Sequence, residues 1–366
     1  MTTAFRQSVA LLAFRPKPEP DELFSSWLTR VAHEQGLKLQ TFCHRVWPGK
    51  QIWNRDIDRC ADDQLIADLA LLTGTPLERA LITTLRSYEG TLFERLNVNG
   101  NTRWLIPVGV YHRVRRRFGL QFCPQCIREK PYFRRLWRLS LVVTCTVHGR
   151  YLLDRCDKCS QPIQLHRSEM GVRHKIEPDD RICSWCGKSL IIMNQRLADS
   201  RLIAIQRTFE LTINGHRPPF GTSAVEYFAV LSDLLAILAS PRPWVRRFRC
   251  LVAVGSGLPL IQGLPRSEST VYFDHMDVTT RGMLLKSLGW LISDWPRRVL
   301  AVASISGARP TDLVRGFERH GRPEWLMELL RSSCPKYQVR LQPQFLQSPS
   351  HEGELQANRF PTFSPH

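Results

Sequence analysis

The sequence lacks any apolar run long enough to cross a membrane. A transmembrane helix needs about 20 mostly apolar residues, and no run approaching that length occurs in the 366 residues. The segment Met1–Phe14 holds one arginine and a short apolar run, and Arg15-Pro16-Lys17-Pro18 follows in place of a small-residue cleavage site. We therefore expect no membrane contact, no signal peptide and a cytoplasmic location, where cysteines stay reduced.

Three common catalytic motifs are also missing. The chain has no GxxxxGK[ST] phosphate loop, which argues against a P-loop ATPase. It has no HExxH and no GxSxG motif, which argues against common metalloproteases and α/β-hydrolases. A dispersed carboxylate triad would leave no such motif. We predict that the protein is not an enzyme and keep a zinc-dependent nuclease or transposase subunit as the least favoured alternative.

Acidic residues are scarce in one part of the chain. The net charge is +18, and residues 101–150 hold 11 basic residues against the single acid Glu129. Residues 1–100 are neutral, with 12 residues of each sign. A localised basic excess is the electrostatic footprint of nucleic-acid binding.

Cysteine and histidine pairs stand out against this background. Four CxxC or CxxH pairs fall within 64 residues, and we predict their eight members as zinc ligands: Cys123, Cys126, Cys145, His148, Cys156, Cys159, Cys183 and Cys186. Pairing in order gives one site of three cysteines and a histidine and one of four cysteines, hence two zinc ions per chain. Interleaved pairing, an iron–sulfur cluster, buried free thiols and disulfides are the alternatives.

Two arginine clusters flank the first ligand pair. Arg113, Arg115, Arg116 and Arg117 precede it, and Arg134, Arg135 and Arg138 follow it. Guanidinium groups suit phosphate oxygens, so we predict these seven arginines as nucleic-acid contacts. The alternative is a solvated charged surface.

Helical periodicity dominates the N-terminal hundred residues. Asp21 is the predicted N-cap of a helix that ends at Gly36. A second helix ends at Gly74, and Thr75-Pro76-Leu77-Glu78 is typical of a capping box that begins a helix to about Arg86. The helix that ends at Gly74 and the helix that follows it give a helix-turn-helix outline.

The C-terminal part returns to helices. Ser223 begins a second capping box and an apolar helix to about Ala239, and another helix runs from about Thr280 to Trp295. Val299–Ile305 and Thr311–Val314 give a second helix-turn-helix outline.

The predicted fold class is mainly α: a helical, helix-turn-helix-like domain at 1–100, a basic stretch with a double zinc module at 101–195, and a helical domain at 196–343. Residues 344–366 are predicted to be a flexible tail.

Several motifs resemble a known family. The opening Phe14-Arg15-Pro16-Lys17-Pro18, the following Glu22 to Ala32, the run Phe122-Cys123-Pro124-Gln125-Cys126, and the pairs Cys145…His148 and Cys156…Cys159 are similar to TniQ/TnsD transposon target-selection proteins. The resemblance covers about residues 10–190 and includes Tyr132 to Trp137. The C-terminal half is similar in being helical and in the stretch Asp294-Trp295-Pro296.

This resemblance implies a bacterial adaptor for transposition that has no catalysis of its own. Such proteins mark the insertion site and recruit an AAA+ ATPase regulator and the transposase. In CRISPR-associated transposons, which the chain length suits best, TniQ docks on an RNA-guided Cascade complex, often as a homodimer. The alternative is a TnsD-like reader of a specific attachment site in DNA. Because residues 1–100 carry no net charge, we expect that domain to bind protein.

Overall fold

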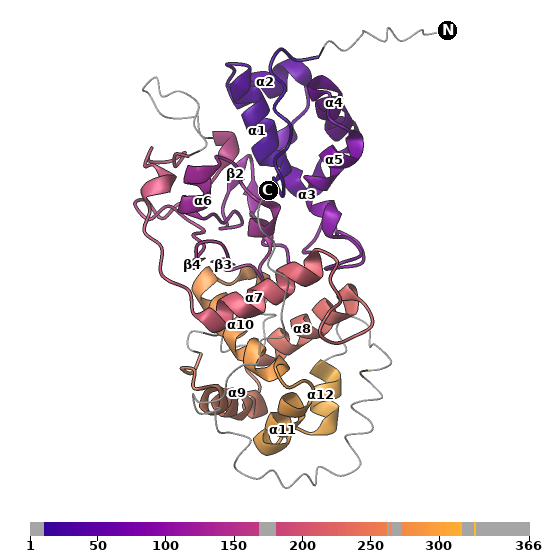
Figure 1. Cartoon of the computed structure of the whole chain (residues 1–366), viewed down its shortest axis with the longest axis vertical. Coiled ribbons are helices and arrows are strands. Elements are labelled where there is room, and N and C mark those ends of the chain that lie inside the picture. The colour runs from indigo at the N-terminus through magenta and orange to yellow at the C-terminus, as the bar shows by residue number, and fades with distance from the viewer. Residues whose placement is uncertain (1–10, 168–180, 262–263, 265–272, 317–325, 327–366) are drawn as a thin grey trace, which may run out of the picture.

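The structure, a computed structural model, describes residues 11–167, 181–261, 264, 273–316 and 326. Over these ranges the chain is mainly α-helical, with two short antiparallel hairpins, which confirms the predicted fold class. Figure 1 shows the N-terminal helices at one end of the long axis, the hairpins in the middle and the later helices at the other end. The C-terminal segment 344–366, predicted as a flexible tail, lies outside the described residues.

The N-terminal helices enclose a core of their own. They are α1 (Phe24–Glu34), α2 (Leu39–Val46), α3 (Ile57–Cys60), α4 (Asp63–Thr73) and α5 (Leu77–Ile82), with 3-10 turns η1 (Ile52–Asn54) and η2 (Leu85–Tyr88). Leu23, Phe24, Trp27 and Leu28 are fully buried. Their spacing of three and four residues forms the apolar face that the sequence predicts.

The predicted N-cap of α1 is wrong. The helix begins at Phe24 after Leu23, and Asp21 instead adopts a left-handed conformation with φ of 60°. The Asp21 carbonyl accepts a hydrogen bond from the backbone N–H of Arg135 at 2.7 Å, and Glu22 forms an isolated bridge with Arg134. A contact with residues more than a hundred positions away therefore sets the start of this helix.

The helix–turn–helix outline is present as α4, Gly74 and α5, but it is shorter than predicted. Gly74 ends α4 in the left-handed conformation, with φ of 61°. Pro76 is the N-cap of α5 and gives no side-chain cap, while the Thr75 hydroxyl lies 2.8 Å from that of Thr73. The predicted capping box is wrong, and α5 ends at Ile82 rather than near Arg86.

The central part holds all the strands of the described residues. β1 (Val110–Tyr111) pairs with β2 (Val114–Arg115), and β3 (Thr144–Cys145) pairs with β4 (Arg150–Tyr151). Short helical segments connect and follow them: α6 (Pro124–Glu129), η3 (Arg135–Arg138), η4 (Leu165–Arg167) and η5 (Leu190–Ile192).

The C-terminal part is a helical bundle of α7 (Ser200–Ile213), α8 (Ala224–Ala239), α9 (Pro243–Ser256), η6 (Phe273–His275), α10 (Val278–Ile292), α11 (Arg297–Ser306) and α12 (Pro310–Gly316). Ser223 caps α8 by accepting a hydrogen bond from the Glu226 N–H at 3.2 Å, as predicted. Gly307, with φ of 79°, separates α11 from α12 and gives the second outline.

Two hydrophobic clusters organise the described residues. One contains only N-terminal residues, from Phe24 to Ala80. The other extends from Leu23 and Leu85 to Leu326 and includes cysteines of both CxxC groups together with the C-terminal helices. The core is therefore continuous across residue 196, where the sequence suggests a domain boundary.

Nothing in the described part of the chain is a single helix long and apolar enough to span a membrane. Among the described residues, only α8 and α9 taken together are long and apolar enough, and the chain bends by 105° between these two helices.

Candidate metal centres and nucleic-acid interface

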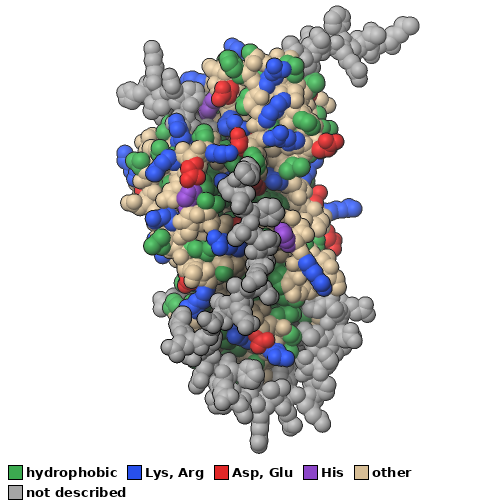
Figure 2. Space-filling view, in the orientation of Figure 1, with side chains coloured by type: hydrophobic (Ala, Val, Ile, Leu, Met, Phe, Trp, Pro, Cys, Tyr) green, Lys and Arg blue, Asp and Glu red, His purple; other side chains and the backbone are tan. Residues whose placement is uncertain are grey.

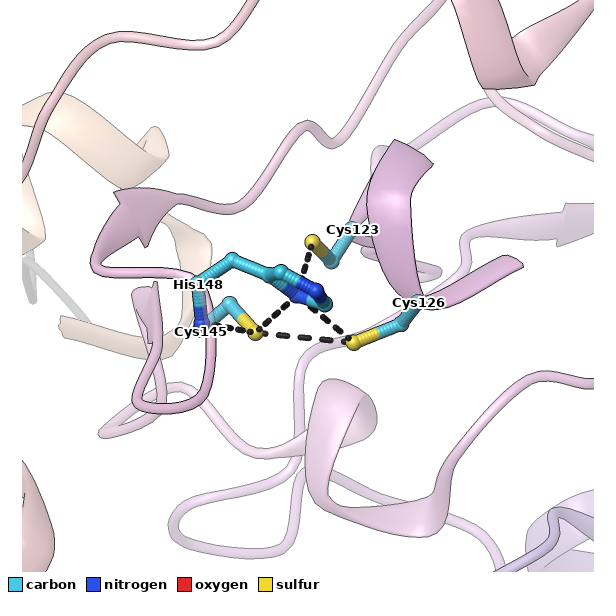
Figure 3. A group of neighbouring side chains, drawn as sticks. All are labelled: Cys123, Cys126, Cys145 and His148. Carbon is cyan, nitrogen blue, oxygen red and sulfur yellow. Dashed lines mark hydrogen bonds between the residues drawn. The ribbon is translucent and has the colours of Figure 1, made fainter. Parts of the chain in front are cut away.

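The first metal group is built from a helix start and a hairpin. Cys123 precedes α6 and Cys126 lies in its first turn. Cys145 ends β3, and His148 lies in the turn before β4, which Gly149 closes with φ of 62°. Figure 3 shows the four side chains pointing toward one another from these two elements. The start of α6 and the turn between β3 and β4 each place two donors on one side, as the CxxC and CxxH spacing predicts.

The donor atoms of this group fit a tetrahedral zinc ion. His148 Nδ1 lies 3.5 Å from Cys123 Sγ and 3.4 Å from both Cys126 Sγ and Cys145 Sγ, and the last two sulfurs are 3.5 Å apart. Tetrahedral zinc with bonds of about 2.3 Å to sulfur and 2.0 Å to nitrogen separates donors by roughly 3.5–3.8 Å. Mutual hydrogen bonds lower the pKa of the Cys123 thiol and raise the pKa values of Cys126 and Cys145, so the three thiols are close enough to share a proton.

Glu129 orients the histidine of this group. Its Oε1 lies 2.9 Å from His148 Nε2, the ring nitrogen that faces away from the sulfurs. With Nε2 carrying a proton donated to Glu129, Nδ1 keeps its lone pair for the metal. Glu129 is the only acid in residues 101–150, and no motif in the sequence predicts a role for it. The sequence feature that points to Glu129 is its position three residues after the ligand Cys126.

The second metal group joins Cys156, Cys159, Cys183 and Cys186. The Sγ atoms of Cys156 and Cys186 are 3.6 Å apart, and those of Cys159 and Cys183 are 3.7 Å apart. Within each of the two groups all ligand atoms lie within 4.8 Å of one another. The eight predicted ligands are thus grouped in sequence order, and the interleaved pairing does not occur.

Both groups could hold a metal ion, and zinc is the ion that their donors suit. Each offers four protein donors, which is the closed arrangement of a structural zinc site rather than a catalytic one with an open position. The histidine in the first group disfavours an iron–sulfur cluster. The two groups are consistent with a double zinc-finger module.

Two of the predicted phosphate-binding arginines are buried, which corrects the prediction for them. Arg138 is 1% exposed, and its guanidinium donates to Asp56 at 2.7 Å and to Asp58 at 2.9 Å. Arg115 is 8% exposed and donates to the backbone oxygens of Trp53 and Arg55. Both side chains join the zinc module to the N-terminal helices, so neither is available to a phosphate group.

Arg134 and Arg135 are half-buried and engaged. The Arg134 guanidinium lies 5.6 Å from the Tyr132 ring centroid and 5.8 Å from that of Trp137. Arg135 Nε lies 3.4 Å from Asp21, and its Nη1 donates to the Ser87 hydroxyl. Arg135 is thus paired within the chain, whereas Arg134 packs on aromatic rings and stays partly exposed.

Arg113, Arg116 and Arg117 are exposed on and beside the β1–β2 hairpin. Arg113 donates to Asn54 and Gln51, and the Arg116 guanidinium lies 3.7 Å above the Tyr111 ring. Among the described residues none of the three has a carboxylate partner. In Figure 2, Lys and Arg side chains are spread over the visible face of the N-terminal and central parts and outnumber the acids. The hairpin is therefore the remaining candidate nucleic-acid interface from the predicted set.

Residues 13–152 match the family model of TniQ. The matched range begins in the segment before α1, includes the hairpin and the first metal group, and ends at β4. No curated protein matches the chain.

Proposed function

We propose that this TniQ-family chain, a transposition-associated protein, is an adaptor that selects the target site and recruits the AAA+ ATPase regulator and transposase to it. The TniQ domain at residues 13–152 carries the proposal. TniQ proteins are adaptors rather than enzymes, and the eight metal donors form two complete sets of four. Two structural zinc ions would hold the central module in shape, with no open position for catalysis.

The hairpin is the proposed nucleic-acid contact. Exposed guanidinium groups of Arg113, Arg116 and Arg117 extend from a two-stranded ladder beside the metal centres. A fixed scaffold holds charges in register with a phosphate backbone better than a flexible loop does, because less conformational entropy is lost on binding. The contact would be independent of sequence and would serve target DNA or the guide RNA of a Cascade-type complex.

The N-terminal helices are the proposed protein contact. Leu71, Leu77 and Ile82 on α4 and α5 are 54%, 48% and 53% exposed, which is high for large apolar side chains. The surrounding domain carries no net charge, so it lacks the positive field that DNA binding needs. We infer that this surface, the α4–α5 surface, contacts a second copy of the chain or the guide complex.

A second candidate function is the TnsD-like reading of one attachment site, which the exposed arginines of the hairpin also favour. Binding to a random duplex and to genomic fragments, measured against salt, distinguishes the two. The adaptor should bind all duplexes weakly and only at low salt, and should co-purify with the ATPase regulator or a guide complex. Tight, sequence-selective binding at physiological salt would instead establish the site reader.

The α4–α5 surface has a test of its own. Leu71→Glu combined with Leu77→Glu should abolish partner capture or the mass of a dimer, whereas Glu78→Ala on α5 should not.

A further inference from the structure

A cleft of about 410 Å³ opens beside the β1–β2 hairpin, where three distant segments meet. Its walls come from residues 106–107 and 116–118 on either side of the hairpin, from Asp154 and Arg155 after β4, and from residues 274–277 ahead of α10. The hairpin and the first wall belong to the TniQ domain, whereas the third wall belongs to the C-terminal bundle. The cleft therefore exists only in the assembled chain.

The cleft lining carries three arginines, Arg116, Arg117 and Arg155, and three aspartates, so its formal charge is balanced. Arg116 and Arg117 line it, and no carboxylate pairs with either one in the described ranges. The acids of the lining are already engaged. Asp154 accepts from Arg155 at 2.7 Å, and Asp277 caps α10 by accepting from two backbone N–H groups. The third acid, Asp274, is half-buried and accepts from the Ser140 hydroxyl.

Flat aromatic surfaces lie next to these arginines. The Arg155 guanidinium lies 3.7 Å above the ring of Phe118, which lines the cleft, and the Arg116 guanidinium lies 3.7 Å above Tyr111 at the rim. Met276 adds an apolar side chain to the lining. Guanidinium planes and aromatic rings are the surfaces on which unpaired bases stack.

Backbone contacts fix the segment that carries Arg116 and Arg117, and Arg117 Nη1 also lies 2.9 Å from His275 Nδ1 across the cleft lining. The Arg116 N–H donates to the Gly109 carbonyl at 2.9 Å and the Arg117 N–H to that of Val108 at 3.2 Å. A Cβ on Gly119 would lie 2.8 Å from the Pro107 carbonyl oxygen. Only glycine therefore allows the segment after the hairpin to approach the segment before it this closely. The cleft wall is thereby held rigid on the hairpin.

We propose that this cleft binds one unpaired nucleotide of a nucleic-acid strand, with its phosphate on Arg116 and Arg117 and its base stacked at Phe118. The volume falls in the range of small-ligand pockets, roughly 300–1,000 Å³. A base inside a duplex cannot enter, because it is paired and stacked on both faces. The proposal rests on the nucleic-acid contact proposed above and adds a preference for single strands, whether RNA or DNA.

The test is fluorescence anisotropy of the full chain with labelled probes of equal length at one salt concentration. The probes are oligo-dT, oligo-rU, a strand of abasic sites and a random duplex. We expect both intact single strands to bind more tightly than the abasic strand, and their relative affinities to distinguish DNA from RNA. Equal binding of the abasic strand would overturn the proposal.

Two variants separate stacking from charge. Phe118→Leu should weaken single-strand binding by about 5- to 100-fold, the range of lost base stacking, with little change in duplex binding. Arg113→Gln, which removes a hairpin charge outside the cleft, should weaken single strands and duplex equally. Equal losses for both probes in Phe118→Leu would overturn the cleft while leaving the hairpin contact intact. Absence of binding to any probe would instead overturn the nucleic-acid contact itself.

A photo-crosslink gives a readout that does not depend on folding of a variant. Oligonucleotides that carry 4-thiouridine or 4-thiothymidine should crosslink to peptides containing Phe118 or Met276. Crosslinks confined to the hairpin tip at Tyr111 would contradict entry of a base into the cleft.

Discussion

Arg138 and Asp58 form a buried ion pair, with Nη1 at 2.9 Å from Oδ2, although 80 positions separate them in the chain. Asp56 accepts from the same guanidinium at 2.7 Å, and the Ile106 carbonyl accepts a further bond. Asp58 in turn accepts from the backbone N–H of Ser25 in α1 at 2.8 Å. One arginine from the central module thus connects α1, α3 and the segment before the hairpin.

Removing this arginine should be strongly destabilising. Arg138→Ala leaves two buried carboxylates without a counter-charge, and breaking a buried pair from one side costs about 3–5 kcal/mol. The free energy of unfolding from urea titration measures the loss. Arg116→Ala, on the exposed hairpin, is the control and should change that free energy by no more than about 0.5 kcal/mol. Similar losses in both variants would contradict a structural role for the ion pair.

Because of Asp274, the free energy of unfolding should fall as the pH rises toward 6. Burial raises the pKa of its carboxyl to about 6, against partial compensation from Ser140 and Arg281. The folded state then keeps a proton that the unfolded chain loses near its ordinary value, about 3.9. The contribution is full below about pH 4 and is lost as pH rises to about 6.

Asp274→Asn isolates this effect. The difference in unfolding free energy between wild type and variant should change by about 1 kcal/mol between pH 5 and 6 and level off above about 6.5. Urea titrations with added zinc at pH 5–7.5 measure it. Glu34→Gln on the surface of α1 is the control. Parallel pH profiles for wild type and Asp274→Asn would refute the prediction.

The metal ligands could be predicted from sequence because their signal is local. Each pair lies on one turn, so a spacing of two residues places both donors on the same side whatever the rest of the fold does. The helices of the C-terminal bundle follow in the same way from apolar periodicity and from local caps such as Ser223. The pairing of ligand pairs in sequence order also follows from short spacers.

Which arginines are buried and which are exposed could not be predicted from the sequence, because it depends on contacts with residues far away in the chain. Arg115 and Arg116 are neighbours in one basic run, yet one is buried against Trp53 and Arg55 and the other is exposed. Arg115 ends β2 and Arg116 follows it, and a strand of two residues leaves little sign in the sequence. The start of α1 was missed for the same reason, since the contact at Arg135 sets it.

Two zinc ions should remain bound per chain. Elemental analysis of the folded, chelator-washed protein should give two equivalents, because both donor sets are complete. Cys156→Ser should lose one equivalent and unfold the centre, since structural zinc contributes on the order of 10 kcal/mol to folding such modules. Cys250→Ser, at an exposed thiol outside both groups, should keep two. A visible absorption band from a cluster, or a single equivalent in wild type, would contradict the assignment.

Glu129→Gln should weaken one zinc site selectively. Glu129 holds the His148 ring through Nε2, and loss of such a partner typically lowers metal affinity by about 10- to 100-fold. Competition with a chromophoric chelator should then release zinc in two separated steps, where wild type releases both ions over a narrower range. Glu78→Gln, an exposed acid on α5, is the matched control. Zinc release from Glu129→Gln that matches wild type would show that the contact does not orient the ligand.

Reversing the exposed hairpin charges should flatten the salt dependence of nucleic-acid binding. Arg113, Arg116 and Arg117 are the members of the predicted set that the structure leaves exposed, and each phosphate contact contributes about 0.9 to the slope of log K against log salt. Changing all three to Glu should lower that slope by up to about 3 and weaken binding equally for all duplex sequences. Arg45, Arg246 and Arg247 changed to Glu alter the net charge by the same amount at exposed positions outside residues 101–150. If the control lowers the slope as much as the hairpin variant does, binding follows the total charge of the protein rather than a contact at the hairpin.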